Sequence, residues 1–320
     1  MQPSAGSPRC TIMKIYHNIN DFKPVKNAVV TIGTFDGVHI GHRKIIATLC
    51  ELAKQTGGET VILTFFPHPR MILHPEDQDI KLITTIGEKA KLLEDLGIDH
   101  LIVTPFSRDF SNLSALEYIH DVLVARIGVK KIVIGYDHRF GKDRKGGLED
   151  LQRLSKEFDY EVIEIPEQDI NAVAVSSTKI REALLNDKVA LANQYLGYPF
   201  FINGKVIRGD QIGRQIGYPT ANILVGETYK LIPADGIFAV TVNVGDELYQ
   251  GMAYIGHRPT INGMTRNIEV NIFDFDHDIY DQIIRINFHH FVRSDFKFDS
   301  LDELKLQLAK DRVDVLKLLS

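Results

Sequence analysis

The sequence predicts a two-domain protein, in which an α/β domain with a doubly wound parallel sheet precedes an all-β domain built as a small closed antiparallel barrel. The chain has 320 residues, more than one hydrophobic core usually supports. Short unbroken apolar runs alternate with helical patterns up to about residue 166. After about residue 186 the period of the apolar residues changes to two. We therefore expect domains at residues 13–186 and 187–320.

The composition is that of an ordinary globular protein, with 44% hydrophobic and 25% charged residues. Lysine and arginine number 37 against 42 aspartates and glutamates, a net charge of −5. This balance argues against a protein that binds nucleic acid or an anionic membrane over its whole surface. The cysteines, Cys10 and Cys50, are too few for a disulfide framework or a four-thiolate zinc site, which favours a reducing compartment, the cytoplasm.

The start of the chain shows no targeting pattern. No apolar run approaches the roughly 18 residues of a membrane span, and the first residues lack the apolar stretch of a secretory signal. Patterned sequence begins only at Met13. We therefore expect residues 1–12 to be a disordered leader.

Uninterrupted apolar runs in the first half suit strands that are buried on both faces of a parallel sheet. These runs are residues 28–32, 61–65, 101–103, 132–134 and 162–165. Apolar residues recur at helical spacing from Ile45 to Ala53, and Ser114 with Glu117 forms a capping box that opens a further helix. Ligands of such sheets bind beyond the carboxyl ends of the strands, so the loops there are the candidates for chemistry.

Alternating side chains in the second half predict antiparallel strands. Phe238, Val240 and Val242 share one face of one strand, and Ile268, Val270 and Ile272 share a face of another. The segment 183–199 is expected to be helical or loop-like. A C-terminal helix capped by Ser300 is expected to cover one edge of the barrel.

The first apolar run leads directly into the sequence G-T-F-D-G-V-H-I-G-H, residues 33–42. Gly33 and Gly37 permit close approach of the backbone to a ligand, and the helix that follows presents free N–H groups to a phosphate. His39 and His42 lie one helical turn apart, so both imidazoles lean towards that anion site and could neutralise charge on a phosphoryl group under attack. We expect Phe35 and Asp36, within the turn, to contribute to phosphate binding.

Other interpretations of this turn remain open. One histidine could cap the helix while the other packs in a satisfied hydrogen bond, or the pair could bind zinc, although no third ligand lies at a suitable spacing. The patterns G-x-x-x-x-G-K-[ST] and G-x-G-x-x-G are both missing from the sequence, so P-loop and dinucleotide-binding interpretations have no support.

This turn resembles the motif of the HxGH nucleotidylyltransferase superfamily, which is shared with class I aminoacyl-tRNA synthetases. Members transfer a nucleotidyl group without a covalent enzyme intermediate. They carry a second phosphate-binding segment, and V-S-S-T-K-I-R at 175–181 is similar to its S-S-T-x-x-R form. Hydroxyls of Ser176, Ser177 and Thr178 at a helix start, with Arg181 one turn along, would clamp a triphosphate and departing pyrophosphate. A plain helix cap with a surface arginine is the alternative.

Two further loops, T-F-F-P-H-P-R at 64–70 and G-Y-D-H-R-F-G at 135–141, resemble loops of FAD synthetase domains. The resemblance implies that the first helps to frame the isoalloxazine and that the second approaches the adenosine portion. The flavin-binding residues expected from these loops are Phe65, Pro67, Pro69 and Asp137. His138 stands where the family usually has phenylalanine, and Phe66 where an acidic residue is frequent. A rigid turn without a ligand is the alternative for the proline-rich loop.

The segment 209–222 of the second half is too rich in glycine for a strand interior. Gly213 and Gly217 could bring backbone N–H groups to phosphate oxygens, and the side-chain oxygens of Thr220 and Asn222 are of the kind that Mg²⁺ accepts. Alternation places Glu269 and Asn271 on the face opposite Ile268, where a carboxylate could accept the proton of an attacking hydroxyl. A solvated strand glutamate is the alternative for Glu269.

The segments from Pro219 to Asn222 and at 256–260, 268–270, 274–276, 291–293 and 297–299 resemble riboflavin kinase domains. Residues 14–312 as a whole resemble the bifunctional riboflavin kinase/FAD synthetase family of bacteria. That resemblance implies a Rossmann-like HxGH adenylyltransferase domain and a six-stranded flavokinase barrel with a terminal helix. It implies that riboflavin and ATP give FMN, and that FMN and a second ATP give FAD and pyrophosphate, each with Mg²⁺.

The same resemblance assigns roles to residues. Thr220 and Asn222 would bind Mg²⁺ and ATP phosphates, and Glu269 would deprotonate the terminal ribityl hydroxyl. Arg293 would contact the flavin, while His39, His42 and Arg181 would stabilise the adenylyl-transfer transition state. We expect a cytoplasmic monomer that handles small molecules and binds neither nucleic acid nor membrane. A different HxGH enzyme with an appended barrel, or a flavin- or RNA-binding module without catalysis, remains an alternative.

Overall fold

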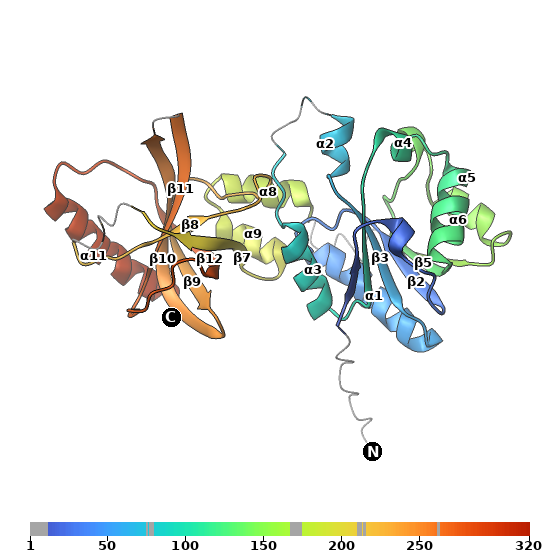
Figure 1. The fold of residues 1–320 in the computed structure, drawn as a ribbon, viewed down its shortest axis with the longest axis horizontal. Helices are drawn as coiled ribbons and strands as arrows, with labels where there is room; N and C mark the ends of the chain where they lie inside the picture. The colour runs from blue at the N-terminus through green and yellow to red at the C-terminus, as the bar shows by residue number, and fades with distance from the viewer. Residues whose placement is uncertain are drawn as a thin grey trace, which may run out of the picture. The chain divides into compact units, whose positions relative to one another are not determined.

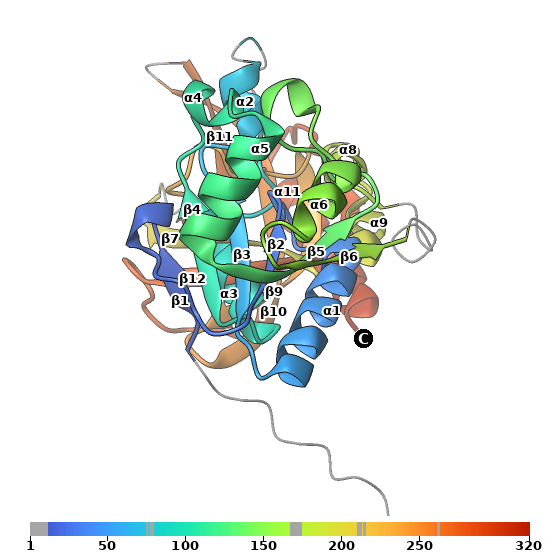
Figure 2. The ribbon, with the colours of Figure 1, turned by 90° about the vertical axis from the view of Figure 1, so that its right-hand side faces the viewer.

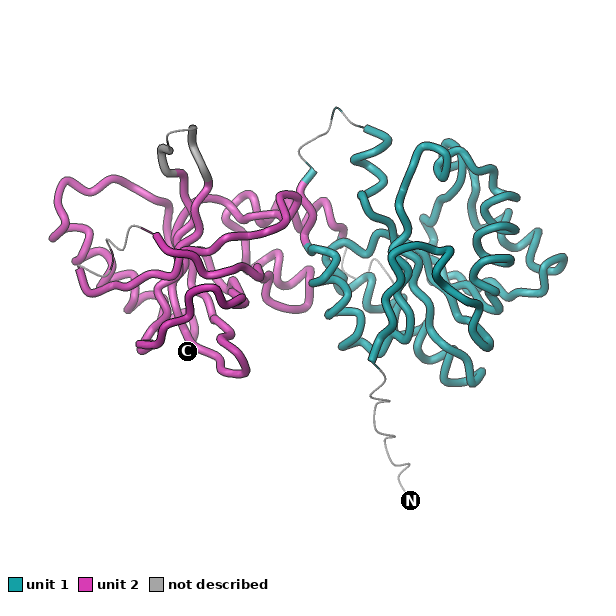
Figure 3. Tube along the Cα trace, in the orientation of Figure 1, with its two compact units in different colours: residues 1–80, 84–175 teal, residues 81–83, 176–320 magenta. Residues whose placement is uncertain are grey.

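The computed structural model of the chain describes residues 12–74, 76, 80–166, 175–209, 213, 216–260 and 263–320. Of the expected leader, residues 1–11 lie outside this described part. The chain divides into two compact units, Met1–Ile80 with Thr84–Val175, and Lys81–Ile83 with Ser176–Ser320 (Figure 3). Residues 81–83 count with the second unit because Leu82 exchanges backbone hydrogen bonds of 2.7 and 2.8 Å with Tyr229 and Leu231. The division falls between residues 175 and 176, ahead of the proposed domain boundary at residue 186, so the helix Ser177–Leu185 counts with the barrel unit.

The first unit is built on a six-stranded parallel sheet of order β1-β4-β3-β2-β5-β6 (Figure 1). Its strands are β1 (Lys14–Tyr16), β2 (Ala28–Ile32), β3 (Thr60–Phe65), β4 (His100–Thr104), β5 (Val129–Gly135) and β6 (Glu161–Ile165). Its α-helices are α1 (Ile40–Thr56), α2 (Pro69–Leu73), α3 (Ile86–Asp95), α4 (Arg108–Ser111), α5 (Ala115–Glu117) and α6 (Leu148–Ser155). The unit also contains a π-helical segment η2 (Tyr118–Ile127) and the 3₁₀ turns η1 (Ile19–Asp21) and η3 (Lys142–Arg144). The α/β prediction is confirmed, and all five expected strands are present.

Helices cover both faces of the sheet. Figure 2 shows α1 below the strands and α5 and α6 above them. All five residues of β2 are buried, which explains why its apolar run has no alternation. The predicted capping box is confirmed: the Glu117 N–H donates to Ser114 Oγ at 3.2 Å, and the Ser114 N–H donates to Glu117 Oε2 at 2.8 Å.

The order of the strands reverses at β2. Strands β3 and β4 follow on one side of β2, whereas β5 pairs with its other side. All these strands are parallel, so the loops after β2 and β5 leave the same edge of the sheet next to each other. This is the position at which open α/β sheets bind ligands.

The second unit contains a closed antiparallel barrel of order β10-β11-β8-β7-β12-β9, which confirms the predicted six-stranded barrel. Its strands are β7 (Phe200–Ile207), β8 (Ala221–Leu224), β9 (Gly236–Val244), β10 (Glu247–Thr260), β11 (Gly263–Ile272) and β12 (Ile283–Arg293). Its helices are α8 (Ser177–Leu185), α9 (Val189–Leu196) and α11 (Leu301–Leu318). Phe200, Phe238 and Phe288 are fully buried, and the Phe238 and Phe288 ring centroids are 5.4 Å apart.

The terminal helix differs from expectation in what it covers. Its cap is as predicted, since the Glu303 N–H donates to Ser300 Oγ at 3.2 Å. A closed barrel has no edge to cover, so α11 packs across β9, β10 and β12 instead. Among the described residues, none of the helices has the length and apolar character that crossing a bilayer would require.

Candidate active sites

The first candidate site is the turn that joins β2 to α1. Its backbone coils tightly, with positive φ angles of 46° at Phe35, 84° at Gly37 and 38° at Val38. His39 caps α1 by accepting a hydrogen bond at Nδ1 from the backbone N–H of His42, at 3.4 Å. The two imidazole rings stack with centroids 3.6 Å apart and planes 17° apart. The capping interpretation is therefore correct for His39, and it also brings both rings to the anion-attracting end of α1.

Gly41 is what lets the two rings meet. A Cβ atom at this position would lie 3.3 Å from the His39 ring and 3.4 Å from Val175 Cγ1. Contacts of 3.3 Å are tighter than side-chain packing normally allows. The glycine between the histidines is thus explained by the space that His39 occupies over the first turn of α1.

Burial makes both imidazoles weak bases. Removal from water lowers the pKa of His39 to about 4, against the opposing effect of the Asp36 charge. Burial, followed by the charges of His39 and Lys89, lowers the pKa of His42 well below its ordinary value. The Nδ1 atom of His42 is buried and has no hydrogen-bond partner among the described residues. Both rings are therefore neutral near pH 7 until an anion arrives to raise their pKa.

Replacing His39 by asparagine should make the protein less sensitive to acid. The unfolded chain binds a proton at this histidine near pH 6.5 and the folded chain only near pH 4. Between these values the unfolded state holds more protons, so the free energy of unfolding falls as pH falls, by about 3 kcal/mol for this one group. Asparagine keeps a capping oxygen but does not titrate. Urea unfolding at pH 7 and pH 4.5 should show a smaller decrease in the free energy of unfolding for the variant than for wild type. An identical decrease would contradict the lowered pKa of His39.

Asp36, which the sequence analysis expected at the phosphate site, lies in a buried polar group behind the turn, together with Thr84 and Lys89, which that analysis did not identify. Asp36 is 1% exposed, and its Oδ1 accepts a hydrogen bond of 3.2 Å from the Thr84 N–H. Thr84 Oγ1 in turn accepts one of 3.1 Å from the Gly37 N–H. Asp36 thus shapes the turn from within. Lys89 is buried nearby, and burial lowers its pKa to about 8 despite the attraction of Asp36.

A sequence signal for Lys89 was available. In α3 this lysine shares the buried stripe with Ala90, Leu92 and Leu93. A charged residue at a core position of an amphipathic helix is seldom fully buried unless it is paired. Thr84 could not be found in this way, because a threonine beside an apolar segment is common in sequences.

The loops after β3 and β5 lie at the same edge of the sheet. Phe65 ends β3, is 9% exposed, and has its ring centroid 5.5 Å from Phe106 and 5.4 Å from Phe110. Pro67 follows a cis peptide bond, and Pro69 is the first residue of α2. Asp137 is exposed on the loop after β5. Phe65 therefore belongs to the aromatic core, whereas Asp137 is accessible to a ligand.

His138, which stands where the family usually has phenylalanine, is partly buried. Its Nε2 atom is buried without a hydrogen-bond partner among the described residues, and burial lowers the pKa of this histidine to about 4. The side chain is thus a neutral ring, 5.8 Å from the Phe140 ring centroid.

The S-S-T-x-x-R segment forms the start of α8. Ser176 caps this helix by accepting a hydrogen bond of 3.3 Å from the Lys179 N–H, and Ser177 and Thr178 occupy its first turn. Arg181 Nε donates to the backbone oxygen of Lys81 at 2.9 Å. This segment belongs to the second compact unit, whereas His39 and His42 belong to the first.

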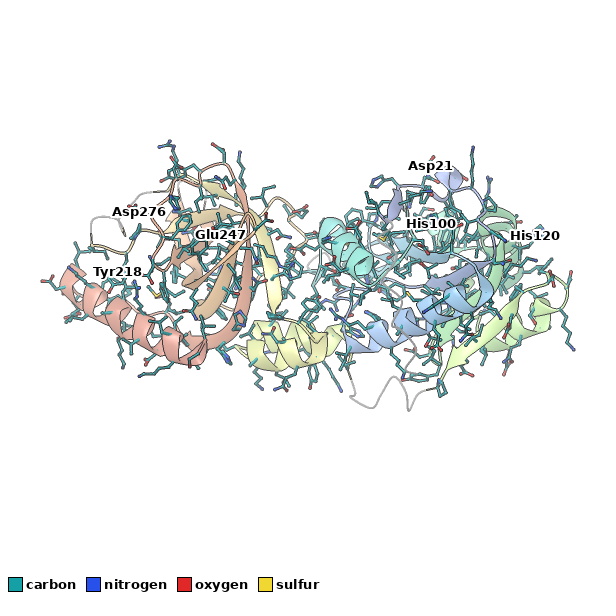
Figure 4. All side chains as sticks on the ribbon, turned by 90° about the horizontal axis from the view of Figure 1, so that it is seen from below. Asp21, His100, His120, Tyr218, Glu247 and Asp276 are labelled. Carbon is teal, nitrogen blue, oxygen red and sulfur yellow. The ribbon has the colours of Figure 1, made fainter. Side chains whose placement is uncertain are left out.

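The second candidate site is a cavity of about 650 Å³ between the barrel wall and α11. Tyr218, labelled in Figure 4, lines it and packs against the apolar cluster beneath α11. The apolar part of the lining is Ile237, Met252, Phe296, Phe298, Leu304 and Leu308. Thr220, Asn222 and Glu269 line the same cavity. One side of the cavity therefore suits a flat apolar ring system and another suits charged groups.

Glu269 is held at both carboxylate oxygens. The Thr220 hydroxyl donates to Oε2 at 3.0 Å, and Asn267 Nδ2 donates to Oε1 at 2.7 Å. Asn222 of β8 pairs directly opposite Glu269 of β11 in the ladder. The structure thus brings together a hydroxyl, an amide and a carboxylate whose positions span 50 residues of the sequence.

Glycines keep this group compact. A Cβ atom on Gly209 would lie 2.3 Å from Asn222 Nδ2, and one on Gly213 would lie 2.2 Å from the Tyr218 backbone oxygen. Gly217 has a φ of 84°, which side-chain-bearing residues rarely adopt. Residues 210–212 and 214–215 of the glycine-rich segment lie outside the described residues.

The donor set at this site consists of oxygen atoms: the Thr220 hydroxyl, the Asn222 amide oxygen and the Glu269 carboxylate. These are the hard donors that Mg²⁺ prefers, so the residues present fit such an ion. The described residues contain no group of three histidine, cysteine, aspartate or glutamate side chains that could hold a metal, which leaves zinc at His39 and His42 without support.

Arg293 is anchored by a partner that the sequence analysis missed. Its Nε and Nη2 donate to the Asp311 carboxylate at 2.9 and 2.7 Å, and Asp311 is 1% exposed. The guanidinium also lies 4.5 Å from the Phe296 ring centroid at the cavity wall. Asp311 falls in the helical series Leu304, Leu308, Asp311 and Val315, and a carboxylate within such a stripe was a readable signal. Arg293 therefore ties α11 to β12.

Replacing Asp311 by alanine should destabilise the barrel unit by about 3–5 kcal/mol, because the Arg293 charge would remain without its partner. The matched control is Asp314→Ala on the same helix. Asp314 forms an exposed ion pair with Lys317, so this change should cost less than about 1 kcal/mol. Denaturant unfolding of the two variants measures the difference in the free energy of unfolding. Equal losses would show that the buried pair of Arg293 and Asp311 stabilises the unit no more than the exposed pair.

These two units define a class of two-domain transferases. A parallel sheet with paired imidazoles at a helix N-terminus is typical of nucleotidyl transfer, and a barrel cavity with a carboxylate among oxygen donors suits phosphoryl transfer to an alcohol. The family model for FAD synthetase matches residues 22–179, and that for riboflavin kinase matches residues 196–319.

Individual relatives agree with these matches. The bifunctional riboflavin kinase/FMN adenylyltransferase of Listeria monocytogenes is 39% identical over 289 residues, covering 90% of this chain and 91% of the relative. That of Escherichia coli K12 is 36% identical over 304 residues, covering 94% and 96%. The chain belongs to the bifunctional riboflavin kinase/FMN adenylyltransferase family. Because both halves match, the alternatives of an unrelated appended barrel and of an RNA-binding module lose their support.

A solved structure from Streptococcus pneumoniae has the same architecture over most of its length. It is described as a macrolide-efflux protein, is 35% identical, and superimposes with a TM-score of 0.85 over 94% of this chain and 97% of that one. This match supports the fold of the present chain. The description of that structure is not transferred, because the relatives of similar identity are named riboflavin kinase/FMN adenylyltransferase.

Proposed function

We propose that the barrel unit transfers the γ-phosphoryl group of ATP to riboflavin, giving FMN and ADP, and that the first unit then adenylylates FMN with a second ATP, giving FAD and pyrophosphate. The observation that carries the proposal is the cavity in which Glu269 meets Thr220 and Asn222 beside an apolar wall. The order of the reactions is fixed by chemistry, because the acceptor of the adenylyl group is the phosphate that the kinase adds.

In the kinase reaction Glu269 acts as general base. Its carboxylate accepts the proton of the terminal ribityl hydroxyl while that oxygen forms a bond to the γ-phosphorus and the bond to the β–γ bridging oxygen breaks. The hydrogen bonds from Thr220 and Asn267 fix the direction of the carboxylate. The apolar wall takes the isoalloxazine ring, and Arg293 positions part of that wall through Phe296.

Thr220 and Asn222 would hold Mg²⁺ together with the nucleotide. When bound, this ion neutralises charge on the phosphate oxygens. Gly213 and Gly217 contribute by allowing the backbone to approach the phosphates closely.

In the adenylylation reaction a phosphate oxygen of FMN forms a bond to the α-phosphorus of ATP, and the bond to the departing pyrophosphate breaks. FMN is already an anion, so no general base is needed. His39 and His42 donate hydrogen bonds to the phosphoryl oxygens, and their pKa values rise as negative charge gathers there. Ser176, Ser177, Thr178 and Arg181 would bind the departing pyrophosphate. The loops that carry Phe65, Pro67, Pro69 and Asp137 would receive the flavin.

We propose that the protein works as a cytoplasmic monomer on small molecules and without nucleic acid. The low cysteine content and the net charge of −5 support this.

The test is to incubate the full chain with riboflavin, ATP and Mg²⁺ and to separate the flavins by chromatography over time. FMN should appear first and FAD should follow. A persistent riboflavin peak would contradict the kinase assignment, and accumulation of FMN without FAD at saturating ATP would contradict the second reaction.

A further inference from the structure

Asn271 is a buried residue at the cavity that the mechanism leaves unused. It lies on β11 two residues beyond Glu269, is 5% exposed, and lines the same cavity. Its Nδ2 donates to the backbone oxygen of Pro219 at 2.7 Å. That bond fixes the orientation of the amide, because only the nitrogen can donate to a carbonyl.

Within the part of the chain that the structure describes, the oxygen of this amide has no partner. Asn271 Oδ1 is buried and makes no hydrogen bond among the described residues. Buried polar atoms in folded proteins are nearly always hydrogen-bonded, so an unpaired acceptor at a cavity wall indicates a donor that arrives with a ligand.

The position of Asn271 indicates which part of a ligand supplies that donor. Glu269 is grouped with Thr220 and Asn222, whereas Asn271 pairs across the ladder with Met252 of the apolar cluster. Successive residues on one face of a strand are about 7 Å apart. Asn271 therefore lies between the site of phosphoryl transfer and the apolar wall.

Riboflavin has the same arrangement of groups. A terminal hydroxyl is followed by three secondary hydroxyls and then by a flat ring system. A neutral amide oxygen accepts hydrogen bonds from hydroxyl groups, whereas it offers nothing to phosphate oxygens, which are acceptors themselves.

We propose that Asn271 Oδ1 accepts a hydrogen bond from a secondary hydroxyl of the ribityl chain, so that Asn271 determines specificity for the polyol side chain of the flavin. The proposal rests on the kinase function assigned to the barrel. Through its bond to Pro219, Asn271 also positions the turn that carries Thr220 beside Glu269.

The experiment is a thermodynamic cycle on the full chain, with riboflavin and its 2′-, 3′- and 4′-deoxy analogues as ligands and quenching of flavin fluorescence as the readout. Wild type should bind one analogue about tenfold more weakly than riboflavin, the effect of one hydrogen bond. Asn271→Leu should bind that analogue and riboflavin equally. Asn271→Asp keeps an acceptor but loses the donor to Pro219, and should still discriminate.

The control variant is Asn287→Leu. Asn287 is a buried asparagine of β12 whose amide is satisfied by Thr241, Asn243 and Arg285, and it does not line the cavity. This variant should retain the discrimination of wild type even if it is less stable.

Each other outcome overturns a defined part of the assignment. Weakening of all flavins by one factor in Asn271→Leu would show that the residue acts only through Pro219. If that variant does not fold, the analogue series on wild type and Asn271→Asp decides, and lack of discrimination in both overturns the proposal. If Asn271→Leu instead changes the preference between ATP and its deoxyribose analogues, Asn271 contacts the nucleotide, and the proposed contact with the ribityl chain is wrong. Failure of wild type to bind riboflavin at all would instead overturn the kinase function.

Discussion

Replacing Glu269 by glutamine should abolish FMN formation while FAD formation from supplied FMN continues. The amide cannot accept the proton of the ribityl hydroxyl, and loss of a general base reduces a rate by about 10²–10⁴-fold. Glutamine retains the size of the side chain and one acceptor for the Thr220 hydroxyl, so the cavity should keep its form. Steady-state production of ADP from riboflavin and ATP, and of pyrophosphate from FMN and ATP, measures the two reactions separately.

The matched control for this change is Glu247→Gln. Glu247, labelled in Figure 4, is an exposed glutamate at the start of β10, so its replacement should leave both rates unchanged. Equal loss of both activities in Glu269→Gln would refute the independence of the two centres. Alanine at position 269 should give the same pattern, since the loss comes from the missing base.

Replacing His42 by alanine should suppress adenylylation by about 10²–10³-fold and leave FMN formation from riboflavin intact. The change removes a hydrogen-bond donor aimed at the phosphoryl oxygens, and single donors of this kind are worth that much in rate. It also leaves His39 without its stacked partner at 3.6 Å. Pyrophosphate release from FMN and ATP is the measurement.

His120→Ala is the control for this second change. His120, labelled in Figure 4, is exposed on η2 and pairs with Asp121. Its replacement should affect neither reaction. Unchanged pyrophosphate release in His42→Ala would remove the histidines from the chemistry.

Much of the fold could be read from the sequence because the signals are local. Unbroken apolar runs such as residues 28–32 indicate burial on both faces, and the alternation of Phe238 and Val240 indicates a strand with two different faces. Ser114 and Ser300 cap their helices as predicted, since a cap depends only on residues within one turn. The residue pattern G-T-F-D-G-V-H-I-G-H likewise predicts a turn between a strand and a helix, which the structure places between β2 and α1.

The tertiary structure decided what depends on distant segments meeting. The return of β5 to the free side of β2, the closure of the barrel and the resulting place of α11 follow from pairings that no local period encodes. Burial is likewise a property of the assembled fold: it makes His39 and His42 neutral, removes Lys89 from water, and encloses Asn271 Oδ1 where no described residue donates to it. The chain alone thus specified which elements form and where chemistry could reside, while packing decided which polar groups lose water and therefore what each of them can do.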